Sequence, residues 1–154
     1  MFFQDLIVQA ATGFVTVGVA GTENIIGSLN GVFFTDANTS KPTFANHLLA
    51  ANGASDIVAL VNDSPLQQYE VRSNNAGASA QADVGATADI AYTAGSTSNF
   101  VSRCTLDDAT VNVAVQQLKI IGVSRDPENN DLTSANVVWR VIINQTAFGD
   151  TSGV

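Results

Sequence analysis

Charged side chains are scarce in this chain of 154 residues, at 13%, and most of them are acidic. Six Lys and Arg stand against fourteen Asp and Glu, and the six are scattered singly along the sequence. Nucleic-acid binding depends on clustered Lys and Arg that neutralise phosphates, and an anionic membrane attracts the same residues. We therefore expect neither a nucleic acid nor a membrane as partner.

Cysteine and histidine are nearly missing, with Cys104 and His47 as the single example of each. One cysteine excludes an intrachain disulfide and a thiolate metal cluster, so Cys104 is interpreted as a small buried hydrophobe. One histidine leaves no second imidazole for a metal site, and no Gly-x-Ser-x-Gly motif is present to hold a nucleophile. His47 is interpreted as having a structural or surface role.

Two acidic clusters are the remaining candidates for chemistry. Asp126, Glu128 and Asn130 reproduce the first ligands of a calcium loop, but the glycine and the bidentate glutamate that should follow are missing. Asp107 and Asp108 are adjacent, and neighbours on a strand point to opposite faces, so they could share a site only in a loop. Both clusters are interpreted as turns, with a non-standard ion site in the first as the alternative. We expect no catalytic residue, no metal and no cofactor, and hence no enzyme.

No apolar run is long enough for a membrane-spanning helix, although hydrophobic residues make up 45% of the chain. That content also excludes disorder, since disordered chains combine low hydrophobicity with many charges. The first basic residue is Lys41, so the start of the sequence lacks the positive region of a signal peptide. We expect a single folded domain that is not exported by a classical route.

The hydrophobic pattern that is present has a period of two, which is typical of strands. Apolar runs or alternations that predict strands occupy residues 14–19, 25–26, 32–34, 57–61, 66–72, 111–115, 118–123 and 137–143. The run at 57–61 is bounded by turn residues and predicts a strand buried on both faces. Trp139 lies within an alternating strand and is expected in the core.

Between these runs the sequence predicts loops and little helix. Residues 74–95 are rich in Ala, Gly and Ser and predict a long loop with one or two short strands, and residues 125–131 predict an exposed turn. Residues 43–51 favour a helix of about two turns. The prediction is an all-β fold: an antiparallel β-sandwich or jelly-roll-like barrel with at most one or two short helices.

The sequence leaves the role of residues 1–26 open, with a single β-sandwich domain expected over residues 27–154. Gly13 and Gly21 bracket the alternating stretch 14–19 and could let it swing as an N-terminal arm that pairs with a neighbouring sheet edge. The alternatives are an edge strand of the same sandwich and a disordered tail. The candidate interface residues of this segment are Phe2, Phe3, Leu6, Ile7 and Val8.

Several stretches, taken in order and spacing, resemble a known family. Residues 31–36 and 40–44 form a Gly-Val-Phe passage, a polar turn, and then Pro and an aromatic. Residues 54–65 and 69–73 follow, and residues 118–123, 126–129 and 139–144 complete the set. Together they resemble the small β-rich structural proteins encoded beside the major capsid protein in tailed bacteriophages. The resemblance covers residues 27–148 in outline.

This resemblance implies a capsid cement, or decoration, protein. Such a protein is made in the host cytoplasm, binds the outside of the phage head in the virion and reinforces the capsid lattice without catalysis. The implied partners are the major capsid protein and further copies of this chain, as a homotrimer. The alternatives are a head-fibre base, a tail protein, or an adhesive or carbohydrate-binding β-sandwich. The low aromatic content of 7% argues against the last of these, the adhesive or carbohydrate-binding β-sandwich.

Overall fold

A computed structural model describes residues 1–112, 114–129 and 131–149, and it shows the predicted all-β fold. The strands form antiparallel sheets, and no sheet of the described chain closes into a barrel. Within the described residues, helical structure is confined to single 3-10 turns: η1 (Ala50–Asn52), η2 (Gln81–Asp83) and η3 (Asp108–Thr110).

The first sheet has five strands and is built around one long strand, β3 (Ile25–Thr35). The first half of β3 pairs with β1 (Leu6–Gln9), which pairs in turn with β2 (Val15–Val17). The second half pairs with β4 (Pro42–Ala45). On the opposite edge of β3 lies β5 (Val58–Asn62), which overlaps both neighbours. The two apolar runs at 25–26 and 32–34 are thus parts of one strand.

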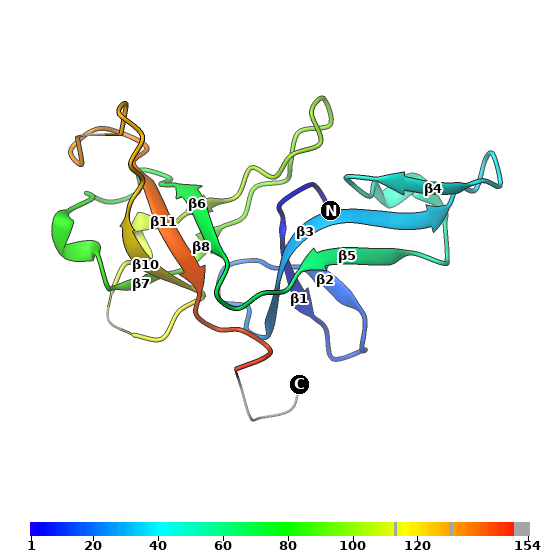
Figure 1. The fold of residues 1–154 in the computed structure, drawn as a ribbon, viewed down its shortest axis with the longest axis horizontal. Coiled ribbons are helices and arrows are strands. Elements are labelled where there is room, and N and C mark those ends of the chain that lie inside the picture. The colour runs from blue at the N-terminus through cyan, green and yellow to red at the C-terminus, as the bar shows by residue number, and fades with distance from the viewer. Residues whose placement is uncertain (113, 130, 150–154) are drawn as a thin grey trace.

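The second sheet has four strands in the order β6 (Gln68–Arg72), β11 (Val138–Ile143), β10 (Leu118–Val123) and β7 (Thr87–Ala88). A two-stranded ribbon of β8 (Ile90–Ala91) and β9 (Thr105–Leu106) lies beside it. In Figure 1 the second sheet occupies one side of the molecule and the ends of β3, β4 and β5 project to the other side. The chain passes from the first sheet to the second between β5 and β6.

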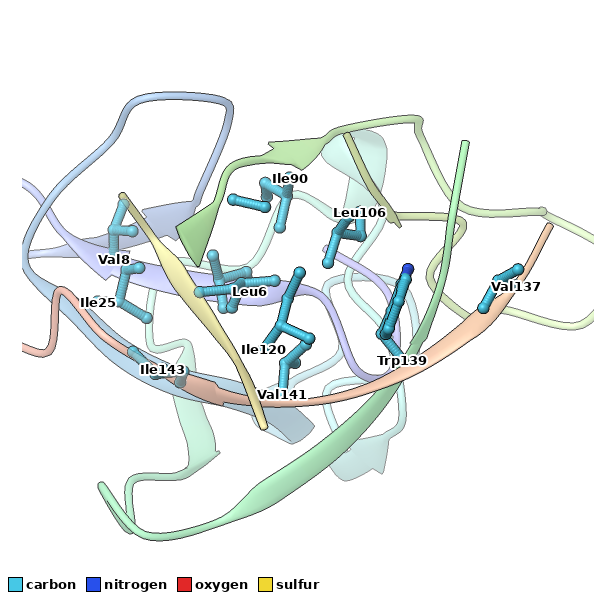
Figure 2. Packing of buried hydrophobic residues seen from close by; sticks show 12 residues of the cluster. Leu6, Val8, Ile25, Ile90, Leu106, Ile120, Val137, Trp139, Val141 and Ile143 are labelled. Carbon is cyan, nitrogen blue, oxygen red and sulfur yellow. The ribbon is translucent and has the colours of Figure 1, made fainter. Parts of the chain in front are cut away.

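The main hydrophobic core lies between the second sheet, the ribbon and the near end of the first sheet. Figure 2 shows Trp139, Ile120 and Val141 of the second sheet facing Leu6 and Ile90. Trp139 is 1% exposed, so its predicted core position is confirmed. The alternation of β10 and β11 is what directs these side chains to one face, because successive residues of a strand point to opposite sides.

The strands predicted at 118–123 and 137–143 are confirmed as β10 and β11. The long loop at 74–95 does carry short strands, β7 and β8, and residues 125–129 are an exposed turn up to the limit of the described residues. The helix predicted at 43–51 is wrong: residues 42–45 form β4, because pairing with β3 overrides their weak helical preference, and η1 is a single turn.

The strand predicted at 111–115 is also wrong in the residues that are described. Val111 follows directly on η3, and Asn112 forms only an isolated bridge with Thr87. Val115 is 76% exposed, and Val113 lies outside the described residues. In the described residues of this stretch, alternation of valine with polar residues therefore does not produce a strand.

The described N-terminal residues do not stand apart from the rest of the chain. β1 lies between β2 and β3, and its Leu6, Ile7 and Val8 are buried. The loop after β2 is held by the fully buried Gln117, whose amide nitrogen donates to the carbonyls of Val19 and Thr22. In the single chain this segment consists of strands of the same fold rather than a detached arm.

A candidate protein–protein interface

One part of the first sheet extends beyond the main core. We call it the wing and define it as residues 31–35 of β3 together with β4 and β5 (Figure 1). One face of the wing is covered by its own chain: Val32 and Phe34 are buried against Leu48 and Ala54 of the segment that follows β4. This small second core explains how the wing holds its shape away from the main core.

The opposite face of the wing, the wing face, is apolar and exposed. Strand register places Phe33 between Phe44 and Val58, and Leu60 beside Gly31, so these residues share one side. The exposed fractions are 47% for Phe33, 58% for Phe44, 54% for Val58 and 43% for Leu60. The prediction that residues 57–61 are buried on both faces is therefore wrong, because β5 is an edge strand whose outer residues have no layer above them in the described chain.

Gly31 gives the wing face its flatness. A Cβ atom added at Gly31 would overlap the ring of Phe44, which lies across the glycine from the neighbouring strand. The phenyl ring therefore rests on the sheet instead of standing away from it. Glycine inside a strand commonly marks such a close approach.

Charge is kept to the margins of the wing face. The residues that register places on this side are Gly31, Phe33, Thr35, Pro42, Phe44, Val58, Leu60 and Asn62, and none of them is ionisable. At the end of β3, the Asp56 carboxylate accepts hydrogen bonds from the Thr35 hydroxyl at 2.7 Å and amide at 3.0 Å, which lower the pKa of Asp56. These hydrogen bonds hold the Asp56 carboxylate at the end of β3, at the margin of the wing face.

The predicted interface residues Phe2, Leu6, Ile7 and Val8 are all buried within the chain's own cores, and Phe3 is half-buried. Phe3 donates its amide hydrogen to the carbonyl of Phe100 at 3.0 Å and accepts one from Ser102 at 2.8 Å. Contact of these five N-terminal residues with a partner stays a prediction, and it would require the N-terminal segment to leave the core. The exposed apolar residues of the wing are the ones that sequence reasoning missed.

His47 belongs to a packing contact near the N-terminus. Its ring stacks on Phe100 with centroids 3.7 Å apart and an angle of 8° between the planes. Partial burial, followed by the positive charge of the N-terminus, lowers the pKa of His47. The ring thus joins the segment after β4 to the loop that holds Phe3.

The remaining candidate groups lie in separate places. Cys104 is half-buried against the main core, and burial raises the pKa of its thiol. Asp107 caps η3, whereas Asp108 is buried and accepts a hydrogen bond from Ser73. Asp126 accepts the amide hydrogen of Glu128 at 3.0 Å in a tight turn, and Asn130 lies outside the described residues.

A cleft of about 740 Å³ lies between the two sheets, and Leu60 and Asn62 of the wing face are among its lining residues. Its walls combine apolar side chains such as Leu29 and Val141 with amides such as Gln68. Among the described residues, no three His, Cys, Asp or Glu side chains gather so that they could hold a metal ion. The described chain also contains no helix long and apolar enough to cross a membrane.

Comparison of the chain with models of protein families, with curated proteins and with solved structures finds no match. What characterises the molecule is therefore its own geometry: an all-β fold with a projecting sheet whose outer face is apolar and free of charge.

Proposed function

We propose that this protein is a structural component of a tailed-bacteriophage virion that binds the outside of the head and reinforces the capsid lattice. The observation that carries the proposal is the wing face. Its residues fall within the stretches 31–36, 40–44 and 54–65, which are three of the seven stretches that together resemble capsid cement proteins.

An exposed apolar surface on a projecting sheet suits a protein that binds other proteins. Apolar side chains gathered on one projecting face are unfavourable in water, and large patches of this kind mark binding sites. The central area of protein interfaces is depleted in charge, as the wing face is. A cement protein works by covering such surfaces in an assembly and needs no catalytic group. Its partners are the major capsid protein and further copies of itself, as a homotrimer, whereas the net charge of −8 opposes nucleic acid and anionic membranes.

The test is reconstitution on phage heads that lack this protein. Purified protein is mixed with such heads and with isolated tails, and both are sedimented. We expect saturable co-sedimentation with heads at a fixed ratio to the capsid protein, and a higher temperature of DNA release from the decorated heads. Binding to tails alone would assign the protein to the tail, and absence of binding to either would refute the proposal.

A further inference from the structure

We propose that the wing face is a contact between two copies of this chain, in which two wings stack face to face. The inference rests on the proposed function in treating the wing face as an assembly surface, and it names the partner of that surface.

In the described chain, no second sheet covers the exposed face of the wing. Sheets in sandwich folds bury both inner faces against each other at about 10 Å. One face of the wing is covered by Leu48 and Ala54 of its own chain, whereas Phe33, Phe44 and Val58 on the other face are about half exposed, beside the cleft that Leu60 lines. A second wing turned over onto the first would supply the missing sheet. Such a contact is isologous, because the same residues face each other from both copies.

The shape of the wing also suits stacking. Gly31 lets the Phe44 ring lie across the sheet, so this ring does not stand out against a flat partner. Figure 1 shows the wing projecting to one side while the second sheet lies on the other. Two antiparallel wings can therefore overlap with the rest of each molecule at opposite ends of the pair.

The wing face exposes enough apolar area for a weak dimer. From their exposed fractions, Phe33, Phe44, Val58 and Leu60 present roughly 400 Å² per copy. With the flanking Thr35, Pro42 and Asn62, a stacked pair buries on the order of 1,000–1,200 Å² in total, close to the lower limit for specific interfaces. The surface therefore suits a reversible dimer with a dissociation constant in the micromolar range.

Charge repulsion between two copies also favours contact through the wing face. Each copy carries a net charge of −8, so an approach through an acidic surface would be repulsive. The wing face contains no ionisable side chain, so stacking it requires no charge to be buried. Repulsion between the rest of the two molecules is screened by salt. The dimer should thus become tighter as ionic strength rises.

The contact is distinct from the proposed homotrimer. An isologous contact joins copies in pairs, whereas a threefold arrangement uses two different surfaces of each copy. If the chain forms trimers through another surface, wing stacking joins those trimers in pairs. Mass therefore distinguishes the two contacts.

The test is the molar mass of the full-length protein, measured by sedimentation equilibrium from about 5 to about 500 μM at low and high salt. The variants are Phe44→Thr and Val58→Thr, which remove apolar surface from the wing face and keep residues suited to strands. We expect wild-type mass to double with concentration and salt, and each variant to weaken the doubling at least tenfold. Phe14→Thr is the matched control, since Phe14 is 77% exposed outside the wing; it should associate like wild type.

Circular dichroism and thermal melting of every variant establish that the fold is retained. A wild-type mass that does not rise with concentration would overturn the inference, and so would doubling that survives both wing variants. Doubling abolished equally by Phe14→Thr would do the same, because any loss of exposed apolar surface would then suffice.

Head co-sedimentation of the same variants distinguishes this inference from the proposed function. Wing-dependent doubling without head binding by wild type supports the inference and refutes the function. A Phe44→Thr protein that binds heads but no longer doubles supports both. If Phe44→Thr loses head binding and leaves the doubling unchanged, the wing face contacts the capsid protein and the inference falls.

Discussion

Asp108 is an acidic residue that the fold buries, with only part of its carboxylate hydrogen-bonded. It is 9% exposed, and one carboxylate oxygen accepts the hydroxyl hydrogen of Ser73 while the other has no hydrogen-bond partner in the described structure. Burial raises the pKa of Asp108, opposed by the hydrogen bond from Ser73. A buried carboxylate with an unsatisfied oxygen costs folding free energy when it is ionised.

Replacing Asp108→Asn should therefore change how stability depends on pH. In wild type the folded state keeps the Asp108 proton to higher pH than the unfolded state. The free energy of unfolding thus falls as pH rises from the ordinary pKa of 3.8 towards the raised value. The variant lacks this loss, so its stability relative to wild type should increase across that window. Urea unfolding at several pH values measures the difference.

Asp131→Asn provides a control of opposite sign. Hydrogen bonds from Thr133 lower the pKa of Asp131, so its contribution is present above the ordinary value and lost as pH falls. Relative to wild type, this variant should lose ground as pH rises, by a small amount because the site is exposed. If the two variants followed the same pH trend, net charge rather than the Asp108 environment would be responsible.

At the scale of elements, Gln117 joins segments that are distant in the sequence. It is fully buried just before β10, and its side-chain oxygen accepts the amide hydrogen of Ile90 at 3.0 Å. Its side-chain nitrogen donates to the carbonyls of Val19 at 2.8 Å and Thr22 at 2.9 Å. One amide thus satisfies backbone groups of the loop after β2 and of β8.

Gln117→Leu should remove these bonds while nearly keeping the volume of the side chain. The Ile90 amide and the Thr22 carbonyl lose these partners, whereas the Val19 carbonyl keeps its bonds from Thr22. We expect a loss of about 3 kcal/mol, equivalent to a fall in melting temperature of roughly 10 °C. Thermal melting followed by circular dichroism measures it. Gln68→Leu, on the exposed side of β6, should stay within about 0.5 kcal/mol of wild type. Equal losses in both variants would contradict this role of Gln117.

Some strands could be predicted from the sequence and others could not. β10 and β11 could be predicted because both faces of their alternation agree with their burial, with Ile120 and Trp139 inside. β4 could not, because its strand structure depends on pairing Phe44 with Phe33 of β3. The apolar run of β5 indicated a strand correctly but not which face would be covered, since coverage depends on neighbours elsewhere in the chain.

At the scale of the whole molecule, β1 decides whether residues 1–26 are an appendage or a part of the fold. Ile7 is fully buried in the small second core that also contains Val32 and Phe34, while Leu6 and Val8 belong to the main core. One short strand thus contributes to both cores. Burial of each such side chain is worth about 1.5–3 kcal/mol, and the three together match a large part of a typical domain's net stability.

Deleting residues 1–12 should therefore lower the melting temperature sharply or abolish cooperative unfolding. The point variant Ile7→Ala should reproduce part of the effect, at about 2–5 kcal/mol, whereas Gln9→Ala, at an exposed position of β1, should change little. Thermal melting of the three proteins measures this. A truncated protein that melts like the full chain would restore the detached arm that the sequence suggested.

The sequence by itself determined the local character of this protein: strands from the period of two, exposed turns from Asn, Asp, Gly and Pro, and Trp139 as a core residue. These properties depend on residues close together in the chain. The tertiary structure alone decided that β1 is internal, that β3 is one strand, and that the wing face stays open, because each depends on pairs such as Ile7 with Gly27 or Phe33 with Val58. Alternation specifies that a strand has an apolar side, but only the placement of distant segments decides whether that side is covered.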